Sequence, residues 1–308
     1  MCILGKGIRE RIAGDRLKQK TVNEYLQQRY GKKLYKVSIN AGFTCPNRDG
    51  TLGERGCIFC SGSGSGDFAE SAALSVSEQI ERGKQRVLAK TSGSFGGYIA
   101  YFQAFTNTHA PVEKLRAVFT EAIEHPDIRI LSVATRPDCL GEDVLELLSE
   151  LNEVKPVWVE LGLQTIHEKT AAYIRRGYAL PVYDRAVKDL KERGLETIVH
   201  VILGLPGETR EEMLESVRYV GRSGVDGIKL QLLHVLKGTD LAGDFYEGKF
   251  RCLSEGEYVS LVKDALEVLP EDIVIHRMTG DGAKRDLIAP MWSADKKHVL
   301  NRLAKELR

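Results

Sequence analysis

The sequence lacks any long apolar run and carries almost no net charge. No segment reaches the roughly 20 consecutive apolar residues that a membrane-spanning helix needs, and the apolar start at residues 1–7 is too short for a signal peptide. The 44 basic and 43 acidic residues leave a net charge of +1, so no bulk field indicates a nucleic-acid partner, although this balance does not exclude RNA. We therefore expect a cytoplasmic protein.

The sequence also lacks internal repeats and a disulfide framework. Of its six cysteines, Cys2, Cys139 and Cys252 are scattered singly, which suits thiols in a reducing compartment. No further cysteine pair is present that could hold an auxiliary cluster. The serine-glycine stretch at residues 61–66 is too short to link two domains, so we expect it to be a loop.

The other three cysteines, Cys45, Cys57 and Cys60, indicate a metal or cluster site. In a reducing compartment, such a group has a use only in ligation or catalysis. A cubane iron–sulfur cluster normally takes four protein thiolates, so three would leave one iron open to a ligand that is not protein. The alternative is a structural zinc ion, which would need a fourth Cys or His, and no close neighbour in the sequence offers one.

Short β-branched runs alternate with amphipathic stretches, which is typical of βα units around a parallel sheet. The expected strands are 36–40, 98–104, 129–135, 156–163, 197–203 and 227–235. The expected crossover helices include 112–124, 142–152, 181–193 and 211–223. Right-handed crossovers place the carboxyl ends of all the strands on one rim, where such barrels assemble their active sites. The cysteine loop follows the first strand and should lie on this rim.

These patterns predict an α/β fold built on a partial (β/α)6 TIM-like barrel of parallel strands. We expect the barrel at residues 36–240, an N-terminal extension at 1–35 and a C-terminal extension at 241–308. The first extension contains a helix at 21–33. The second contains a helix at 253–269, a strand-like segment at 273–276 and a basic helix at 294–307, and it is a candidate substrate-binding element.

Motifs spread over nearly the full length carry a family resemblance. They are CPNRDG at 45–50, YFQ at 101–103, TNT at 106–108, GLPGE at 204–208 and HRMTGDG at 276–282. With them the chain resembles radical S-adenosylmethionine (SAM) enzymes, in the bacterial YhcC-like family related to the radical SAM domain of the elongator catalytic subunit. The resemblance implies that the three cysteines hold a [4Fe–4S] cluster whose fourth iron binds SAM. One electron then cleaves SAM to a 5′-deoxyadenosyl radical, which abstracts hydrogen from the substrate.

The cysteine spacing departs from the family pattern. The usual first gap is three residues, whereas eleven separate Cys45 from Cys57. The gap contains Gly50, Gly53 and Gly56, which let the loop double back and return its thiolates to one point. The second half of the motif, residues 57–60, is intact, and Phe59 matches the aromatic residue that usually lies near the adenine of SAM.

The resemblance also implies contacts to SAM at the strand ends. Gln103 and Thr106 stand where relatives place paired glycines that receive the methionine amino group. Gln164 resembles a ribose-binding residue, and Arg176 resembles the arginine that pairs with the methionine carboxylate, for which a guanidinium fork is suited. His200 stands where relatives often have a ribose-binding aspartate.

Two further positions complete the expected cofactor site. Glu160 is expected to make the polar contacts of a carboxylate that relatives often carry at the position of Ala134. His234 follows the sixth expected strand and either faces the rim near the adenine or packs inside. The turn at 204–208 lacks the lysine-serine pair of a phosphate-binding loop and the three-glycine dinucleotide fingerprint. We interpret it as backbone beside the adenine.

The tail carries the candidate substrate contacts. They are His276, Arg277, Asp281, Lys284, Arg285, Trp292, Lys296, Lys297, Arg302, Lys305 and Arg308. Such cations and an aromatic ring can bind phosphate and stack a base, but a solvated basic helix with a structural tryptophan is the alternative. The resemblance implies tRNA as partner, with the C5 side chain of the wobble uridine as substrate, and flavodoxin or ferredoxin as low-potential electron donor. The alternative function is a non-catalytic, zinc-stapled RNA-binding protein.

Overall fold

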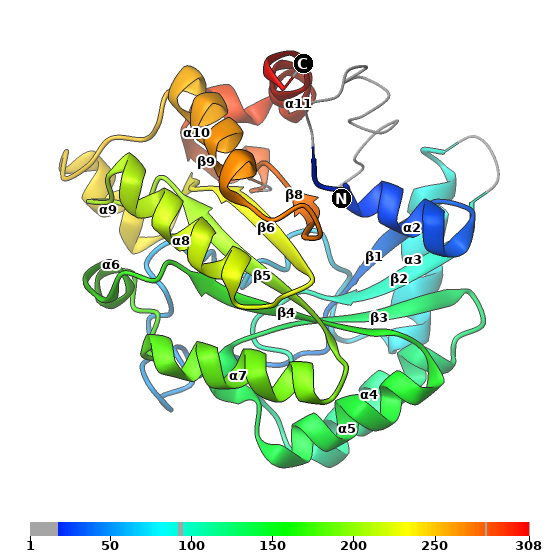
Figure 1. Cartoon of the computed structure of the whole chain (residues 1–308). Coiled ribbons are helices and arrows are strands. Elements are labelled where there is room, and N and C mark those ends of the chain that lie inside the picture. The colour runs from blue at the N-terminus through cyan, green and yellow to red at the C-terminus, as the bar shows by residue number, and fades with distance from the viewer. Residues whose placement is uncertain (1–17, 92–94, 281, 308) are drawn as a thin grey trace.

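One curled parallel sheet organises the computed structural model, which describes residues 18–91, 95–280 and 282–307. Seven strands follow one another in the order β1-β2-β3-β4-β5-β6-β8 (Figure 1). Their bounds are Leu34–Ile39, Gly97–Phe102, Ile128–Thr135, Val157–Gln164, Glu196–Leu203, Gly227–Leu232 and Val274–Arg277. All the neighbouring pairs are parallel. The predicted α/β partial barrel is confirmed.

Helices cover the outer face of this sheet (Figure 1). The helices between the strands of the sheet are α3 (Val76–Leu88), α4 (Val112–Glu124), α5 (Glu142–Val154), α6 (Glu168–Tyr173), α7 (Leu180–Glu192), α8 (Arg210–Arg222), α9 (Asp240–Tyr246) and α10 (Glu255–Val268). Helix α2 (Val22–Tyr30) precedes the sheet and α11 (Lys296–Glu306) follows it. None of the described helices is both long and apolar enough to cross a membrane.

The C-terminal extension contributes to the sheet, which the prediction of six strands did not include. The segment expected to be strand-like at 273–276 forms β8, and Gly227 in β6 pairs with Val274. The expected strand 227–235 ends earlier, at Leu232. Beyond it, β7 (Val235–Leu236) leaves the barrel and pairs antiparallel with β9 (Leu287–Ala289) in a second, two-stranded sheet.

The apolar core lies between the sheet and its outer helices. Strand β3 is buried at every position but Arg129, as expected for a strand covered on both faces. Helix α4 turns Leu115 and Phe119 toward the sheet, and the ring of Phe119 meets that of Phe102 edge-on at 5.0 Å. Since this packing fixes strand positions and all six crossovers bring the strands back parallel, the loops after the strands meet at one rim.

Candidate active site

The three cysteines of the loop after β1 line one cavity of about 240 Å³ at the rim. The loop folds back as the glycine spacing predicts: Gly56 donates its N–H to the Asn47 carbonyl at 2.6 Å. Gly56 has φ +73°, and a Cβ on it would lie 2.8 Å from Nε of Arg48, so this turn needs glycine. The gap of eleven residues therefore does not separate Cys45 from Cys57 in space.

The thiols in this cavity are not arranged as reactive nucleophiles. Burial raises the pKa of Cys57, and it raises the pKa of Cys60 to about 11. Both would stay protonated and unreactive at neutral pH as ordinary thiols. Coordination to a metal is what deprotonates such a thiol outright, so the donor set suits ligation.

Cations near the sulfur atoms suit an anionic group held by thiolates. Arg48 donates from Nη2 to the carbonyls of Cys60 at 3.0 Å and Ser61 at 2.8 Å. Arg136 also lines the cavity and is held by two hydrogen bonds to Asp138, at 2.9 and 2.7 Å. Its positive charge lowers the cost of charging Cys57, against the effect of burial.

The spread of the sulfur atoms favours a cluster over a single zinc ion. Around one zinc with Zn–S bonds near 2.3 Å, tetrahedral sulfur ligands lie about 3.8 Å apart. In the described part of the chain, the three cysteine sulfurs do not form a group within 4.8 Å of one another, and no described His, Asp or Glu completes such a group with them. A cluster places each thiolate on a different iron, so its ligands are more widely spaced.

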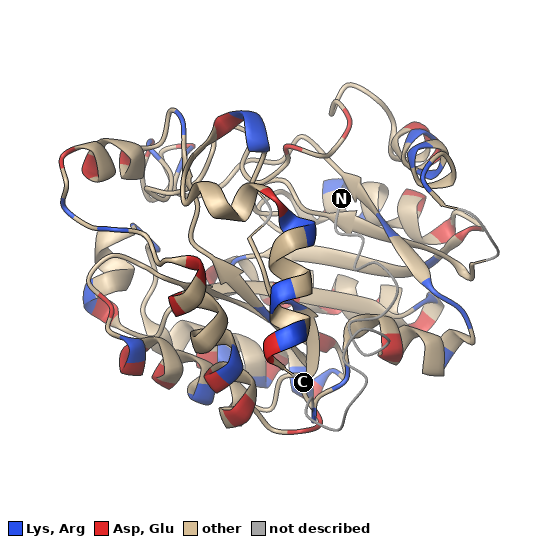
Figure 2. Cartoon of the chain, turned by 90° about the horizontal axis from the view of Figure 1, so that it is seen from above, with Lys and Arg blue, Asp and Glu red and all other residues tan. Residues whose placement is uncertain are grey.

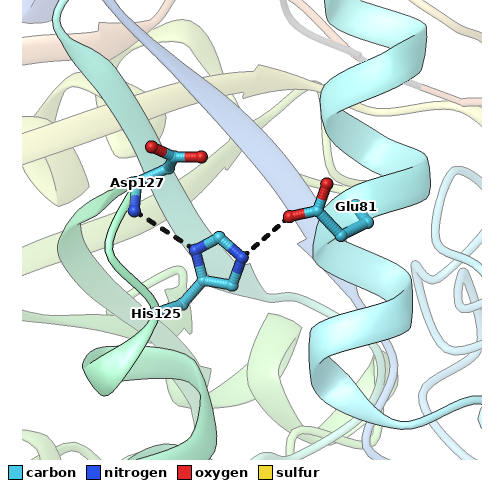
Figure 3. A group of neighbouring side chains, drawn as sticks. All are labelled: Glu81, His125 and Asp127. Atoms are coloured by element: carbon cyan, nitrogen blue, oxygen red, sulfur yellow. Dashed lines mark hydrogen bonds and ion pairs between the residues drawn. The ribbon is translucent and has the colours of Figure 1, made fainter.

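One compact group of possible metal ligands does exist, on the outer helices. Glu81 of α3, His125 and Asp127 approach one another there (Figure 3). The Asp127 N–H donates to Nδ1 of His125 at 3.2 Å, so His125 carries its proton on Nε2 and gives it to Glu81 at 2.9 Å. Lys84 already pairs with both carboxylates, at 2.6 and 2.5 Å. This group is an internally satisfied ion-pair cluster.

The structure places all the predicted cofactor-site residues around the cavity that the cysteines line. They are Phe59, Gln103, Thr106, Glu160, Gln164, Arg176, His200 and His234. Gln164 ends β4 at φ +70°, and its Oε1 is buried without a hydrogen-bond partner, so this acceptor is available to a ligand. The predicted roles of the eight side chains toward SAM remain predictions.

Among these side chains, Arg176 and His234 fix neighbouring loops. The Arg176 guanidinium donates to the carbonyls of Thr165 at 2.6 Å and Tyr178 at 3.0 Å, so it fixes the loop after β4. His234 accepts from the Gly282 N–H through Nδ1 at 3.2 Å, and its Nε2 lies 3.0 Å from Oγ of Ser293. Through His234, the end of β6 is joined to the tail. Of the tail candidates, Asp281 and Arg308 lie outside the described residues.

A charged network on the inner side of the barrel was not predicted from the sequence. Glu160 accepts from Lys36 at 2.8 Å, from Ser132 at 2.9 Å and from Nε2 of His200 at 2.8 Å, and it pairs with Lys229. Lys229 also donates to the Tyr101 hydroxyl at 3.1 Å. Glu160 is fully buried. A lysine inside an apolar strand was the signal that could have indicated this network.

Electrostatic attraction within the network favours the charged form of Glu160. Burial opposes ionisation of Glu160, but the ammonium groups of Lys229 and Lys36 outweigh it and hold the pKa of that carboxyl well below its usual range. Burial lowers the pKa of His200 to about 4, helped by the charge of Lys229. His200 is therefore neutral at neutral pH and donates its Nε2 proton to Glu160. Its Nδ1 is left as a hydrogen-bond acceptor.

Comparison with known proteins connects this site to one family. A family model described as the Radical SAM superfamily matches residues 44–220, and one described as the Radical_SAM C-terminal domain matches residues 225–308. YtqA of Bacillus subtilis is 47% identical over 287 residues, which are 93% of this chain and 88% of YtqA. YhcC of Escherichia coli is 38% identical over 278 residues, which are 89% of this chain and 88% of YhcC.

Two more distant matches are a tRNA uridine(34) acetyltransferase and a solved structure of an archaeal Elp3. The tRNA uridine(34) acetyltransferase of Methanocaldococcus jannaschii is 27% identical over 164 residues, which are 52% of this chain and 30% of that protein. The structure of the archaeal Methanocaldococcus infernus Elp3 with an N-terminal deletion superposes with a TM-score of 0.65 at 17% identity. The superposition covers 89% of this chain and 64% of that chain, and it shows a shared fold.

Proposed function

This chain belongs to the radical SAM superfamily, and we propose that it is an enzyme that abstracts hydrogen from the C5 side chain of the tRNA wobble uridine. The observation that carries its radical chemistry is the cavity at the rim, which is lined by the three cysteines Cys45, Cys57 and Cys60. The substrate assignment has separate support and is tested separately.

The cofactors of the superfamily are a [4Fe–4S] cluster and SAM, as the sequence predicted. When bound, they supply the reductive cleavage of SAM that generates a 5′-deoxyadenosyl radical. The cavity fits them chemically, because it offers thiol donors, nearby cations and the unpartnered Oε1 of Gln164. Cys45, Cys57 and Cys60 would hold the cluster, which leaves one iron for SAM.

The other side chains at the rim would bind and orient SAM. In this proposal Phe59 lies near the adenine, Gln164 and His200 bind the ribose, and Arg176 serves the methionine carboxylate. His200 can accept from a ribose hydroxyl because Glu160 holds its proton on Nε2. Since a primary radical attacks the nearest hydrogen, the main work of these residues is positioning and the exclusion of water.

The remaining predicted cofactor contacts are Gln103, Thr106, Glu160 and His234, which also line the cavity. Gln103 and Thr106, after β2, would serve the methionine amino group, and Ser38 already donates to Oε1 of Gln103 at 3.3 Å. Glu160 would act through His200 and not by direct contact. His234 would border the adenine, held in place by its bonds to the tail.

Two observations support a tRNA substrate. A partial relative is a tRNA uridine(34) acetyltransferase, and the matching segment is about half of this chain. In addition, exposed Lys237 and Arg285 line a side cleft of about 240 Å³, together with the carboxylates of Asp67 and Asp286. This cleft shares Ser61, Asp67 and Leu236 with the main cavity. Cations beside the mouth suit the phosphates that flank a nucleotide whose base enters the cavity.

Radical SAM enzymes need an electron donor of low potential, because the cluster must be reduced before SAM is cleaved. We expect flavodoxin or ferredoxin to fill this role. The expectation is tested by adding each reduced protein to the cluster-loaded enzyme and measuring 5′-deoxyadenosine. A rate no higher than with the reducing system alone would reject that donor.

The radical chemistry is tested on protein purified without oxygen and reconstituted with iron and sulfide. We expect about four iron atoms per chain, a brown colour that dithionite bleaches, and release of 5′-deoxyadenosine from SAM. Cys57→Ala should lose all three, whereas Cys139→Ala should keep them. A colourless protein with one tightly held zinc ion would instead support the zinc-stapled RNA-binding alternative.

The substrate is tested by comparing tRNA nucleosides from cells with and without the gene. We expect one modified wobble uridine to disappear and its precursor to accumulate. Re-expression of the wild-type protein should restore the nucleoside and Cys57→Ala should not. Identical nucleoside profiles would reject the tRNA substrate and leave the radical chemistry unaffected.

A further inference from the structure

The long gap between Cys45 and Cys57 folds around one side chain, that of Asn47. The Asn47 side chain is buried, with an exposed fraction of 5%. Its own carbonyl accepts the N–H of Gly56 at 2.6 Å, which closes the loop just before Cys57. Its side-chain Nδ2 reaches the carbonyl of Arg175 at 2.6 Å and Sγ of Cys57 at 3.3 Å.

The orientation of this amide follows from its partners. The Arg175 carbonyl can only accept, so the nitrogen of the Asn47 amide, and not its oxygen, must face it. An amide nitrogen carries two protons. One is used by the Arg175 carbonyl, and the other is shared between the sulfur of Cys57 at 3.3 Å and the carbonyl of Arg176 at 3.4 Å. The contact is therefore an N–H···S hydrogen bond whose geometry is held by a second bond.

We propose that Asn47 is a positioning residue that raises the reduction potential of the cluster through its hydrogen bond to Cys57. The proposal rests on the proposed function, because it takes Cys57 as a cluster ligand. Reduction adds negative charge that spreads onto the thiolate sulfurs, so an N–H donor stabilises the reduced cluster more than the oxidised one. The eleven-residue gap gives the chain enough length to fold back and place Cys57, the next ligand, beside Asn47.

The test is a redox titration of the reconstituted wild-type protein and of Asn47→Leu, followed by EPR of the reduced cluster. Leucine keeps a branched shape of similar reach but has no donor. We expect the equilibrium between reduced and oxidised cluster to shift about tenfold toward the oxidised form, which for one electron is 59 mV toward more negative potential. Iron and sulfide content per chain should equal that of wild type.

Asp49→Asn is the matched control, because Asp49 lies in the same loop but binds His109 at 2.7 Å and not a sulfur. Losing its negative charge would, if it has any effect, move the potential in the positive direction. A purely structural role of the loop would instead lower cluster content in both variants and leave the potential of the loaded fraction unchanged. An unchanged potential in fully loaded Asn47→Leu overturns the proposal.

A second measurement covers the case in which Asn47→Leu does not assemble a cluster. Wild-type protein is labelled with 15N in asparagine side chains, and its reduced cluster is examined by pulsed EPR. We expect a coupling to one labelled nitrogen that Asn107→Asp retains, and its absence overturns the proposal. Wild-type protein that holds no cluster at all is a different result, because it rejects the proposed function itself.

Discussion

Glu160 joins four strands of the barrel through its hydrogen bonds. Its carboxylate binds Lys36 of β1, Ser132 of β3, His200 of β5 and Lys229 of β6. Removing the charge leaves the ammonium of Lys229, only 1% exposed, without its counter-ion. Glu160→Gln should therefore lower the free energy of unfolding by about 3–5 kcal/mol, the range for breaking a buried ion pair.

Urea unfolding of the cluster-loaded proteins measures this change. The double variant Glu160→Gln/Lys229→Met removes both charges and should recover more than half of the loss, because no uncompensated buried ammonium remains at Lys229. Equal losses in the single and double variants would mean that the two charges are not coupled.

His200 gives a prediction for pH. Its pKa is about 4 in the folded protein, against 6.5 for an ordinary histidine, and burial is the main cause. Between these values the unfolded chain binds a proton that the folded one does not, so stability falls as pH drops from 6.5 toward 4. Urea unfolding at pH 7.0, 6.0 and 5.0 should show the free energy of unfolding falling as the pH falls. In His200→Asn the slope of this decline should be smaller by the amount that corresponds to one bound proton. The same slope in both proteins would contradict it.

That the predicted site residues would line one cavity could be expected from the sequence, because the ends of parallel strands gather them. Gln164 and His200 lie on different strands, far apart in the chain, yet they line one cavity. The family resemblance indicated which residues to choose along the chain, and the parallel sheet explains why they lie close together. The partners of each side chain could not be predicted in this way. That Lys229 reaches Glu160 depends on which faces of β4 and β6 turn inward, and this follows from three-dimensional packing.

The loop at residues 61–66 packs against the end of β2, and its glycines are not equivalent. Gly64 has φ +57°, and a Cβ there would collide with the ring of Phe105, whereas a Cβ on Gly62 meets nothing within 4 Å. Gly64→Ala should therefore displace the loop that follows Cys60. We expect reduced iron content after reconstitution and little change for Gly62→Ala. Equal loading of the two variants would show that the fit against Phe105 does not hold the site.

Local periodicity in the sequence was enough to predict most of the strands of the sheet and several of its helices. It did not predict helix α3 or the pairing of strand β8. Helix α4 was predicted with its observed bounds, because its apolar positions repeat at helical spacing. Helix α3 was missed, although Ser75 and Glu78 form a capping box at its start. Strand β8 was seen as strand-like, but its place beside β6 depends on pairing across the chain. Propensity does not encode that pairing.

Across the whole molecule, charge is balanced in number but not in distribution. Exposed basic residues recur along α11, whose C-terminal end is marked in Figure 2. Many exposed cations pair with a nearby carboxylate, as Arg251 does with Glu257 at 2.6 Å and Arg302 of α11 does with Glu255 at 3.8 Å. The net charge of +1 of the whole chain therefore does not reflect the basic character of α11, whose exposed cations are suited to contact phosphate.

Lys297 and Lys305 on α11 provide the test of this surface. Both are exposed, and α11 lies well apart from α7 (Figure 1). Lys297→Ala/Lys305→Ala should weaken tRNA binding, because binding through fewer phosphate contacts releases fewer counterions. The slope of log K against log salt should fall by about 1 per lysine that contacts a phosphate. Release of 5′-deoxyadenosine without tRNA should stay unchanged.

The matched control is Lys188→Ala/Lys191→Ala, which removes the same charge from exposed positions of α7. If tRNA binds α11 specifically, this control should keep the wild-type salt slope, because its lysines contact no phosphate. If both double variants lose the same affinity, binding depends on total charge, and α11 has no special role. If neither loses affinity, the phosphate contacts must lie elsewhere, and the cations beside the cavity mouth, Lys237 and Arg285, become the positions to substitute.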